Sequence, residues 1–316
     1  MNWNDLQTFL TVAQAKSFSR AADTLHLTQP AISKRIQRLE ADFGVSLFDR
    51  VGKQIHLTAA GNLLRPRAEA LMSDLRDTQR LLHNLKQEVS GVLALATSHH
   101  VGLHRLSPVL RAFTASYPQV RLDMRFEDSE AAHELVRTAR SEMAIVTLDP
   151  HGADDLEYLP VWDDPLCFVI SEQHALAPKA ATATRISMAE LTQQGVILPG
   201  LATYTGRIVV ELFGSQGLTL TPSMSTNYLE TIGMLVAAGL GWSVLPASMV
   251  GEGLLTLSTD APALHRTLGC VTHPQRTLSN AAAAFRGVLE SFQDPEMSAE
   301  FRRVRDFAPD GASGDP

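Results

Sequence analysis

Apolar side chains, with one threonine among them, return at alternating intervals of four and three residues along one stretch of this 316-residue chain. The positions are Leu64, Ala68, Leu71, Leu75, Thr78, Leu82, Leu85 and Val89. A repeat sustained over more than three heptads is typical of a helix that pairs with another helix. It predicts one long helix over 58–89, which separates a short N-terminal part from a larger C-terminal part.

We expect this helix to form a dimer, with contacts from Leu64, Leu71, Leu75, Leu82 and Leu85. Pro66 is expected to kink or restart the helix near its first turn, because proline lacks the N–H that the helix needs. A core helix of the C-terminal part is the alternative interpretation. The predicted division is 1–58, a linker and dimerisation helix over 59–90, and the remainder.

The parts on either side of the helix differ in charge. Residues 1–88 hold 12 Lys and Arg against 9 Asp and Glu, and the excess within 16–67 is 9 against 4. Residues 89–316 hold 15 basic and 25 acidic residues. A basic module joined to an acidic body indicates a head that binds a polyanion and a body with another task.

Apolar spacing in residues 1–58 predicts three short helices and a β-hairpin. A helix over 4–15 is followed by a second that Ser17 or Ser19 caps. The third begins at Thr28-Gln29-Pro30, where a threonine cap precedes a proline, and ends near Gly44. Two short apolar segments within 46–57 predict a β-wing. This arrangement predicts a winged helix-turn-helix.

The outer face of the third helix is free to enter a major groove of DNA, where residues near the helix start contact bases and cations contact phosphates. That face carries Gln29, Ser33, Lys34, Arg35 and Arg38, and the wing adds Arg50 and Lys53. A helical subdomain with an ordinary solvated basic face is the alternative interpretation.

Several motifs in this part closely resemble the DNA-binding domain of LysR-type transcriptional regulators. They are Phe9, Ser17-Phe18-Ser19-Arg20-Ala21-Ala22, Thr28-Gln29-Pro30-Ala31-Ile32-Ser33, Leu39-Glu40, Leu47-Phe48-Asp49-Arg50 and Leu57-Thr58-x-x-Gly61. The likeness covers about the first 65 residues without a gap.

The resemblance implies base contacts from Gln29, Pro30 and Ser33, and phosphate or groove contacts from Arg20, Lys34, Arg35 and Arg50. Ser19 and Thr28 complete the expected interface. It also implies that the long helix is the linker and dimer helix of the family.

Beyond residue 91, strands alternate with helices, which predicts parallel sheets covered on both faces and a cleft between them. The resemblance implies a periplasmic-binding-protein-like α/β effector module over 91–295 with two subdomains. Their expected ranges are about 91–162 with 268–295, and 163–267, with crossings near Val161–Pro165 and His265–Leu268. The tail, 296–316, has a composition typical of disorder.

Polar residues at the predicted strand ends mark a small-molecule site. The first strand ends at Ser98, where a starting helix offers N–H groups to an anion; Ser98 as a mere helix cap is an equal alternative. Asn227 is expected to cap a later helix. The candidate effector-binding residues are Thr97, Ser98, His99, His100, Thr147, Leu201, Ala202, Thr203, Thr205 and Asn227.

The segments Ala96–His100 and Thr205–Arg207 are similar to the branch of the family that governs sulfur assimilation, whose effectors include small sulfur anions. His100 stands where that branch tends to carry a hydroxyl residue, so direct transfer does not follow. The hypothesis for the cleft is an anionic or carboxylate effector.

Other chemistry finds little support in the sequence. His100 and His104 lie at metal-binding spacing, but no third ligand follows at such spacing, so no metal site or cofactor is predicted. Cys167 and Cys270 lie in apolar strands, which indicates buried, unreactive thiols unless the crossing strands bring them together. Nucleophile-elbow, Walker and dinucleotide motifs are absent, which argues against an enzyme.

These features predict a transcription regulator that binds promoter DNA as a dimer or as a tetramer of paired dimers, and that affects RNA polymerase indirectly. A small molecule in the cleft is expected to regulate it. The sequence shows neither a signal peptide nor a membrane span, so a cytoplasmic location is expected. The alternative is an α/β small-molecule-binding protein or enzyme with an incidental basic domain.

Overall fold

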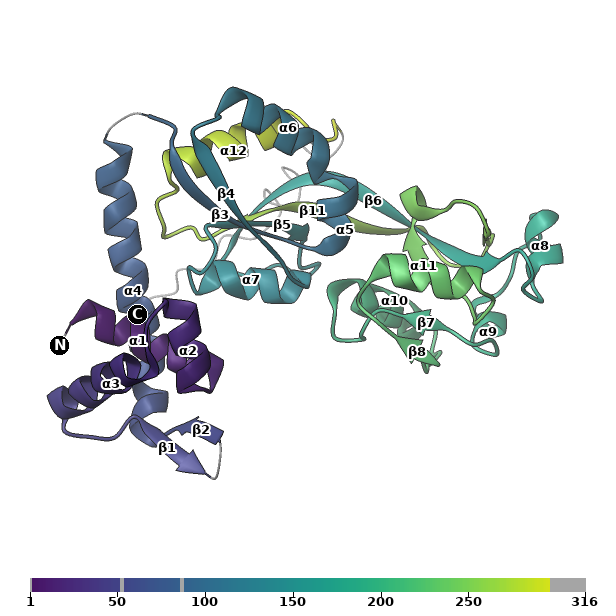
Figure 1. Cartoon of the computed structure of the whole chain (residues 1–316). Coiled ribbons are helices and arrows are strands. Elements are labelled where there is room, and N and C mark those ends of the chain that lie inside the picture. The colour runs from purple at the N-terminus through teal and green to yellow at the C-terminus, as the bar shows by residue number, and fades with distance from the viewer. Residues whose placement is uncertain (1, 52–53, 86–87, 296–316) are drawn as a thin grey trace, which may run out of the picture. The chain divides into compact units, whose positions relative to one another are not determined.

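The structure is a computed structural model that describes residues 2–51, 54–85 and 88–295. The chain divides into two compact units, residues 1–86 and residues 87–316, which we call the head and the body. Figure 1 labels the elements of both units. The predicted tail, 296–316, lies outside the described residues.

Three helices form the centre of the head, as the sequence predicts: α1 (Trp3–Ala15), α2 (Phe18–Leu25) and α3 (Gln29–Phe43). Their apolar faces bury Phe9, Val12, Ile32 and Leu39 completely. Ser17, rather than Ser19, caps α2 by accepting a hydrogen bond from Arg20 N at 3.3 Å. The third helix begins after Thr28, has proline in its first turn and ends at Gly44.

The wing consists of β1 (Phe48–Val51) and antiparallel β2 (Gln54–Leu57). Glu40 of α3 binds the start of the wing, since Glu40 Oε1 accepts hydrogen bonds from Leu47 N at 2.7 Å and Phe48 N at 3.4 Å. The Leu39-Glu40 motif therefore joins the third helix to the wing.

The long helix, α4, spans Ala59–Asn84 and continues through Pro66 without a restart. Its predicted end at Val89 is wrong, because the helix ends at Asn84 and Val89 packs against the core of the body. The two ends of the repeat also differ: Ala68 is fully buried in the head, whereas Leu82 and Leu85 are 63% and 78% exposed.

The first subdomain of the body has a sheet whose strands β3, β4 and β5 are parallel, with helices on both faces. The antiparallel pairing of β11 with β5 makes the sheet mixed, so the prediction of a wholly parallel sheet is wrong. Figure 1 shows α6 and α12 on one face and α7 on the other. The bounds are β3 (Gly91–Thr97), α5 (His99–His104), α6 (Leu106–Ser116), β4 (Val120–Phe126), α7 (Ser129–Arg137), β5 (Met143–Thr147), β11 (Leu264–Thr272) and α12 (Asn280–Glu290).

The second subdomain packs its helices around Trp242, which is fully buried against the rings of Phe168 and Phe213. Trp242 Nε1 donates a hydrogen bond of 2.9 Å to Leu191 O, so the indole is both packed and satisfied. The bounds are β6 (Glu157–Ser171), α8 (Ala177–Ala181), α9 (Met188–Leu191), β7 (Ile197–Leu198), α10 (Tyr204–Ser215), β8 (Met224–Ser225), α11 (Leu229–Ala237), β9 (Ser243–Pro246), a 3-10 turn (Ala247–Met249) and β10 (Leu254–Thr256).

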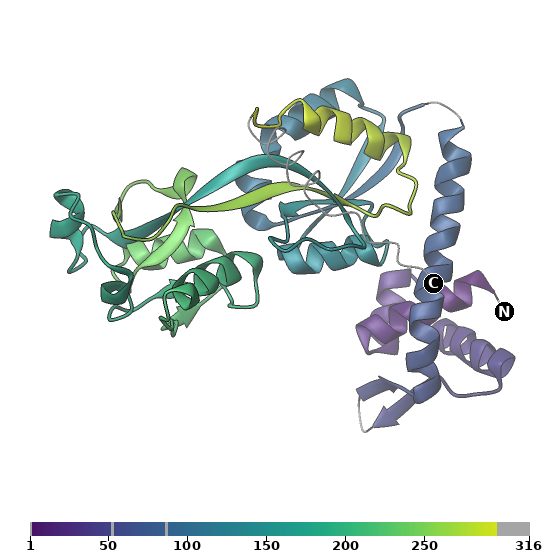
Figure 2. The ribbon, with the colours of Figure 1, turned by 180° about the vertical axis from the view of Figure 1, so that it is seen from behind.

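Two long strands, β6 and β11, connect the subdomains. They pair antiparallel, with Asp164 opposite Arg266 and Pro165 opposite His265. Figures 1 and 2 show them side by side from opposite directions. Both strands contribute to both cores, since Trp162 and Leu268 belong to the first and Leu166 and Leu264 to the second.

The Gly61→Ala variant tests the junction of wing and long helix. A Cβ at Gly61 would lie 2.2 Å from the carbonyl oxygen of Leu47, a backbone atom that cannot move alone. We expect the head to lose about 1–3 kcal/mol of unfolding free energy, the usual cost of overpacking. Calorimetry of the full chain measures it. Gly287→Ala in α12, where a Cβ meets nothing within 4 Å, is the control; equal stability of both variants would contradict the argument.

Candidate functional site

The head presents the predicted DNA-contacting residues of α2 and α3 mainly at its surface. Those that are exposed are Ser19, Arg20, Thr28, Gln29, Pro30, Lys34 and Arg38, whereas Ser33 and Arg35 are half-buried. Arg50 lies on β1 opposite Ile55, and Lys53 lies outside the described residues. The start of α3 therefore offers a hydroxyl, an amide and a lysine to solvent.

Two of the arginines also hold the head together. Arg38 Nη2 lies 2.7 Å from Oδ1 of Asp5, a carboxylate of α1 that is fully buried. Arg35 Nη1 donates a hydrogen bond of 3.3 Å to Thr8 Oγ1, also on α1. These contacts orient α3 on α1, a role that the sequence analysis did not assign to either arginine.

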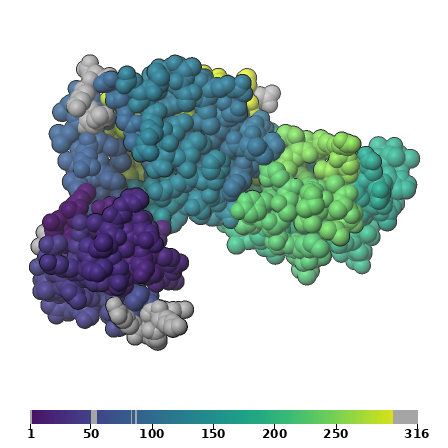
Figure 3. All heavy atoms as spheres, in the orientation of Figure 1, coloured from purple at the N-terminus to yellow at the C-terminus, as the bar shows by residue number. Residues whose placement is uncertain are grey.

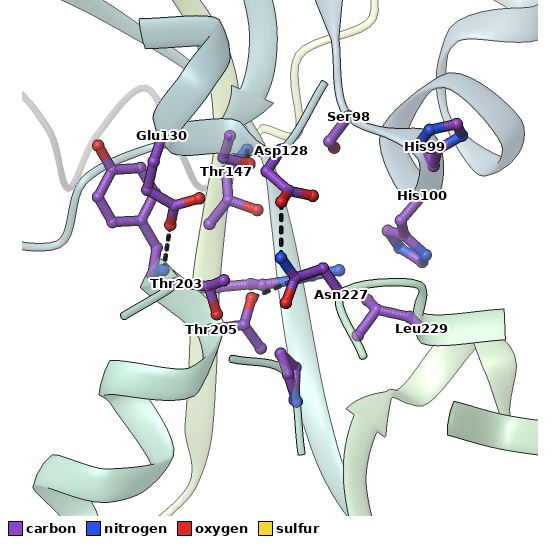
Figure 4. Close-up of a pocket in the computed structure, with 14 residues that line it drawn as sticks. Ser98, His99, His100, Asp128, Glu130, Thr147, Thr203, Thr205, Asn227 and Leu229 are labelled. Carbon is purple, nitrogen blue, oxygen red and sulfur yellow. Dashed lines mark hydrogen bonds between the residues drawn. The ribbon is translucent and has the colours of Figure 1, made fainter. Parts of the chain in front are cut away.

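The body contains a cleft between its two subdomains, with an open volume of about 480 Å³. Figure 3 shows the subdomains as two touching lobes, the first in blue and the second largely in green, and Figure 4 shows the side chains of the cleft. The lining residues are Ser98, His99, His100, Asp128, Ser129, Glu130, Thr147, Pro199, Thr203, Tyr204, Thr205, Asn227, Leu229 and Arg266.

Most of the predicted effector residues meet in this cleft. Those that line it are Ser98, His99, His100, Thr147, Thr203, Thr205 and Asn227. In the described part of the chain, Thr97, Leu201 and Ala202 do not line it. Thr97 is fully buried, and its hydroxyl donates to Ile145 O at 2.8 Å, so it ties β3 to β5 instead.

The sequence analysis missed the charged residues of the cleft. Asp128 and Glu130 lie at the start of α7. In the sequence, the only indication of them was that two acidic residues follow shortly after a predicted strand. Arg266 lies within β11, between a histidine and a threonine, and a charged residue inside a predicted strand was the available signal. Tyr204 begins α10, next to residues that were predicted.

Arg266 is the buried cation of the cleft. Its Nε donates a hydrogen bond of 2.6 Å to Asp164 Oδ2, and its Nη1 donates one of 3.0 Å to Thr205 Oγ1. Arg105 Nη2 shares Asp164 from the other side, at 3.2 Å from Oδ1. Arg266 Nη2 is buried without a hydrogen-bond partner. Burial lowers the pKa of Arg266, and Asp164 opposes that shift.

Two carboxylates of α7 bind groups of the second subdomain. Glu130 Oε1 accepts a hydrogen bond from Tyr204 N, at the positive end of the α10 dipole. Asp128 Oδ2 accepts one of 2.6 Å from Asn227 Nδ2, which Figure 4 shows across the cleft. Burial raises the pKa of Glu130. The cleft thus already contains two anions bound to donors.

The predicted cap of α11 is wrong. Tyr228, not Asn227, occupies the N-cap position, and its side chain makes no capping hydrogen bond. Asn227 Oδ1 instead accepts a hydrogen bond of 2.9 Å from Gly200 N. Since its Nδ2 binds Asp128, Asn227 connects the turn after β7 to the first subdomain. Ser98 occupies the N-cap position of α5 but also makes no capping bond, so its hydroxyl remains available to the cleft.

His100 is 5% exposed, and neither of its ring nitrogens has a hydrogen-bond partner. Burial, and then the nearby Arg266, lower its pKa to about 4, against the effect of Asp164 and Glu230. The imidazole is therefore neutral at pH 7.

The two cysteines do not form a redox pair. Cys270 is paired with Leu159 of β6, and Cys167 lies eight residues further along that strand, roughly 26 Å away. Burial raises the pKa of Cys270 to about 12 and also raises that of Cys167. Both thiols are therefore poor nucleophiles at neutral pH.

A head with a helix-turn-helix and a two-lobed body with a ligand cleft define a ligand-binding DNA-binding regulator. Residues 3–62 match the model of the bacterial regulatory helix-turn-helix protein, lysR family, and residues 86–293 match that of the LysR substrate binding domain. The chain belongs to the LysR family.

The RuBisCO operon transcriptional regulator of Allochromatium vinosum is 29% identical over 287 residues, 89% of this chain and 93% of that protein. The uncharacterized HTH-type transcriptional regulator YfeR of Shigella flexneri is 29% identical over 294 residues, 92% of this chain and 94% of that protein. CbnR, solved with its target DNA, aligns with a TM-score of 0.62 at 20% identity, over 92% of this chain and all of CbnR.

The protein is thus a transcriptional regulator rather than an enzyme, and the predicted fold class is confirmed. Regulators of this family bind DNA and effectors, and they oligomerise. No helix in the described ranges has both the length and the apolar character that crossing a membrane requires.

The stability of the body should depend on pH through His133. Its Nδ1 donates to Ser129 O at 2.7 Å, its ring contacts Tyr204, and burial lowers its pKa below the usual 6.5. Below pH 6.5 the unfolded chain binds a proton on this histidine more readily than the folded body does. The free energy of unfolding should therefore decrease as the pH is lowered below 6.5.

Denaturant unfolding between pH 5 and 8 measures this slope. His133→Asn should reduce it but leave the part that comes from His100, whose pKa is lowered to about 4, while His151→Asn, which changes an exposed histidine, should keep the wild-type slope. A wild-type slope in the His133→Asn variant would show that another group controls the dependence.

Proposed function

We propose that this regulator binds promoter DNA as a dimer, assembled further as a tetramer of paired dimers, and that a small anionic or carboxylate molecule in the cleft controls it. It affects RNA polymerase indirectly, through the DNA it occupies, and acts in the cytoplasm. The proposal also takes the chain as divided at residues 58 and 90, with subdomains that meet at the β6 and β11 crossings.

The observation that supports an anionic effector is the unpartnered Nη2 of Arg266. A buried donor without an acceptor costs about 1–3 kcal/mol, more for a charged group, so a bound oxygen there is strongly favoured. Ser98, Thr147 and Thr205 supply hydroxyl groups to the same space. The N-terminus of α10 adds N–H groups, one of which already binds the Glu130 carboxylate.

Glu130 and Asp128 suggest how the effector acts. Each carboxylate belongs to the first subdomain and binds a donor of the second, so together they stabilise one arrangement of the lobes without a ligand. An effector carboxylate that binds the same donors replaces these contacts with its own. The two arrangements then differ in effector affinity, which is the requirement for a population shift.

On DNA, we propose that Gln29, Pro30 and Ser33 contact bases while Arg20, Lys34 and Arg50 contact the backbone, with Ser19 and Thr28 beside them. The remaining expected contacts are Arg35, Arg38 and Lys53. Support comes from the solvent-facing position of the start of α3 and from the contacts that orient α3 on α1.

We propose that dimers form through the outer half of α4. Leu71, Leu82 and Leu85 are 51%, 63% and 78% exposed, a large apolar surface for one helix, and they follow the heptad spacing. Leu64 contributes less, because it packs partly against the core of the head. Leu75, half-buried, lies between Leu71 and Leu82 in the repeat.

Fluorescence anisotropy on genomic fragments, including the one upstream of its own gene, tests the DNA interface. Ser33→Ala should weaken specific binding by about 1–3 kcal/mol, as expected for a base contact. Lys34→Ala should weaken binding to all fragments and reduce the salt dependence by about one ion for each head.

Lys179→Ala is the matched control, since it removes an exposed lysine of the body that pairs with Glu190. It should bind as wild type does. Wild-type affinity of the Ser33→Ala and Lys34→Ala variants on every fragment would refute the assignment of the interface.

A thermal-shift screen of small carboxylates and oxyanions, in a buffer with a metal chelator, tests the effector proposal. A ligand that binds only the folded state raises the melting temperature. Glu130→Gln should bind such an anion about tenfold more tightly, because it removes a competing negative charge from the α10 N-terminus.

The control is Glu134→Gln, one turn further along α7, where the exposed carboxylate pairs with Arg137 instead. Its affinity should equal that of the wild type. If only neutral or cationic metabolites stabilise the body, the effector is not an anion.

A further inference from the structure

A second site lies beside the cleft, where two histidines of α5 meet a glutamate of α11. His104 Nε2 is 3.1 Å from Glu230 Oε1, and His100 Nδ1 is 3.7 Å from the same oxygen. Among the described residues, these three side chains place one nitrogen or oxygen each within 4.8 Å of one another. From this geometry we propose that His100, His104 and Glu230 bind a divalent transition-metal ion such as Zn²⁺.

The spacing of the three atoms suits such an ion. With metal–ligand distances of about 2.0–2.1 Å, two ligand atoms of a tetrahedral site lie roughly 3.4 Å apart. The separations of Glu230 Oε1 from the two histidine nitrogens, 3.1 and 3.7 Å, lie on either side of that value. The two histidine nitrogens lie within 4.8 Å of each other and would move closer on binding the ion. Two histidines and one glutamate also form a known set for zinc, which leaves the fourth position to water.

His100 gives the strongest reason to place an ion here. Its ring is 5% exposed, and both nitrogens lack hydrogen-bond partners, although buried polar atoms are normally satisfied. Nδ1 faces Glu230, and Nε2 faces Asp164 Oδ2 at 3.8 Å. A metal ion on Nδ1 and a carboxylate beyond Nε2 is the common order of ligand and outer partner around a zinc histidine.

The charges around the ring are also compatible with a cation. Asp164 and Glu230 attract it, while Arg266 opposes it and is already paired with Asp164.

The ion would join the two subdomains, because α5 belongs to the first and α11 to the second. Local spacing does not reveal Glu230 as the third ligand, since it lies 126 residues from His104. The site is distinct from the anion-binding donors of Arg266 and α10, although His100 also lines the cleft.

Isothermal titration of the full-length, untagged protein with ZnCl₂, after chelator treatment and removal of the chelator, tests the proposal. The wild type should bind one ion per chain at this site. His104→Ala and Glu230→Gln should weaken that binding by more than about 100-fold, since even an outer partner contributes about 10- to 100-fold. Both side chains are about one-third exposed, so the variants should fold. Melting curves of the metal-free variants check this.

The matched control is His151→Ala. It removes a histidine that pairs with Glu211 at the same 3.1 Å but has no second histidine beside it. This variant should bind zinc as the wild type does. Tetrahedral visible absorption bands of the Co²⁺-loaded wild type, lost in His104→Ala, provide a second measurement that does not depend on affinity.

The proposal is overturned if the wild type binds no zinc, or if His104→Ala binds it unchanged. Equal loss in His151→Ala would also overturn it, because the ion would then lie elsewhere. Since neither DNA nor a candidate effector is present, and the anion screen contains chelator, failure here leaves the proposed effector site untouched.

Discussion

The buried ion pair between Asp164 and Arg266 is the interaction on which the body depends. Removing two charges from water is costly, and only close contacts and further hydrogen bonds compensate it. Here Arg105, from the first subdomain, and Thr205, at the start of α10 in the second, supply those bonds. Because the pair also joins opposite residues of the two crossing strands, both lobes are tied to one charged centre.

That centre gives the cleft its buried positive charge. Arg266 extends beyond Asp164, and its Nη2 finds no hydrogen-bond acceptor among the described residues. The cleft therefore contains one buried donor without an acceptor. Glu130 and Asp128 reach the other donors from α7 and occupy them. The lobes are therefore connected by hydrogen bonds from two carboxylates of the first subdomain to donors of the second.

The sequence predicts those parts of the molecule that local rules determine. The start of α3 after Thr28 and the end of β5 at Thr147 follow from local sequence signals, and the structure has both, although the Thr28 side chain makes no capping hydrogen bond. The long helix ends early because Val89 packs into a core that no local pattern reveals. Asn227 was assigned to a cap for its position, whereas a distant aspartate determines its contacts.

In the cleft, too, local sequence patterns fail to reveal contacts between residues that are distant in the chain. Ser98 and Thr203 were found because they precede helices, but Arg266 enters the cleft only through tertiary structure. Contacts across 74 residues, as between Glu130 and Tyr204, leave no trace in local spacing. A single sequence considered by itself therefore identifies hydroxyl and backbone donors at strand ends, but not the charged side chains of the cleft.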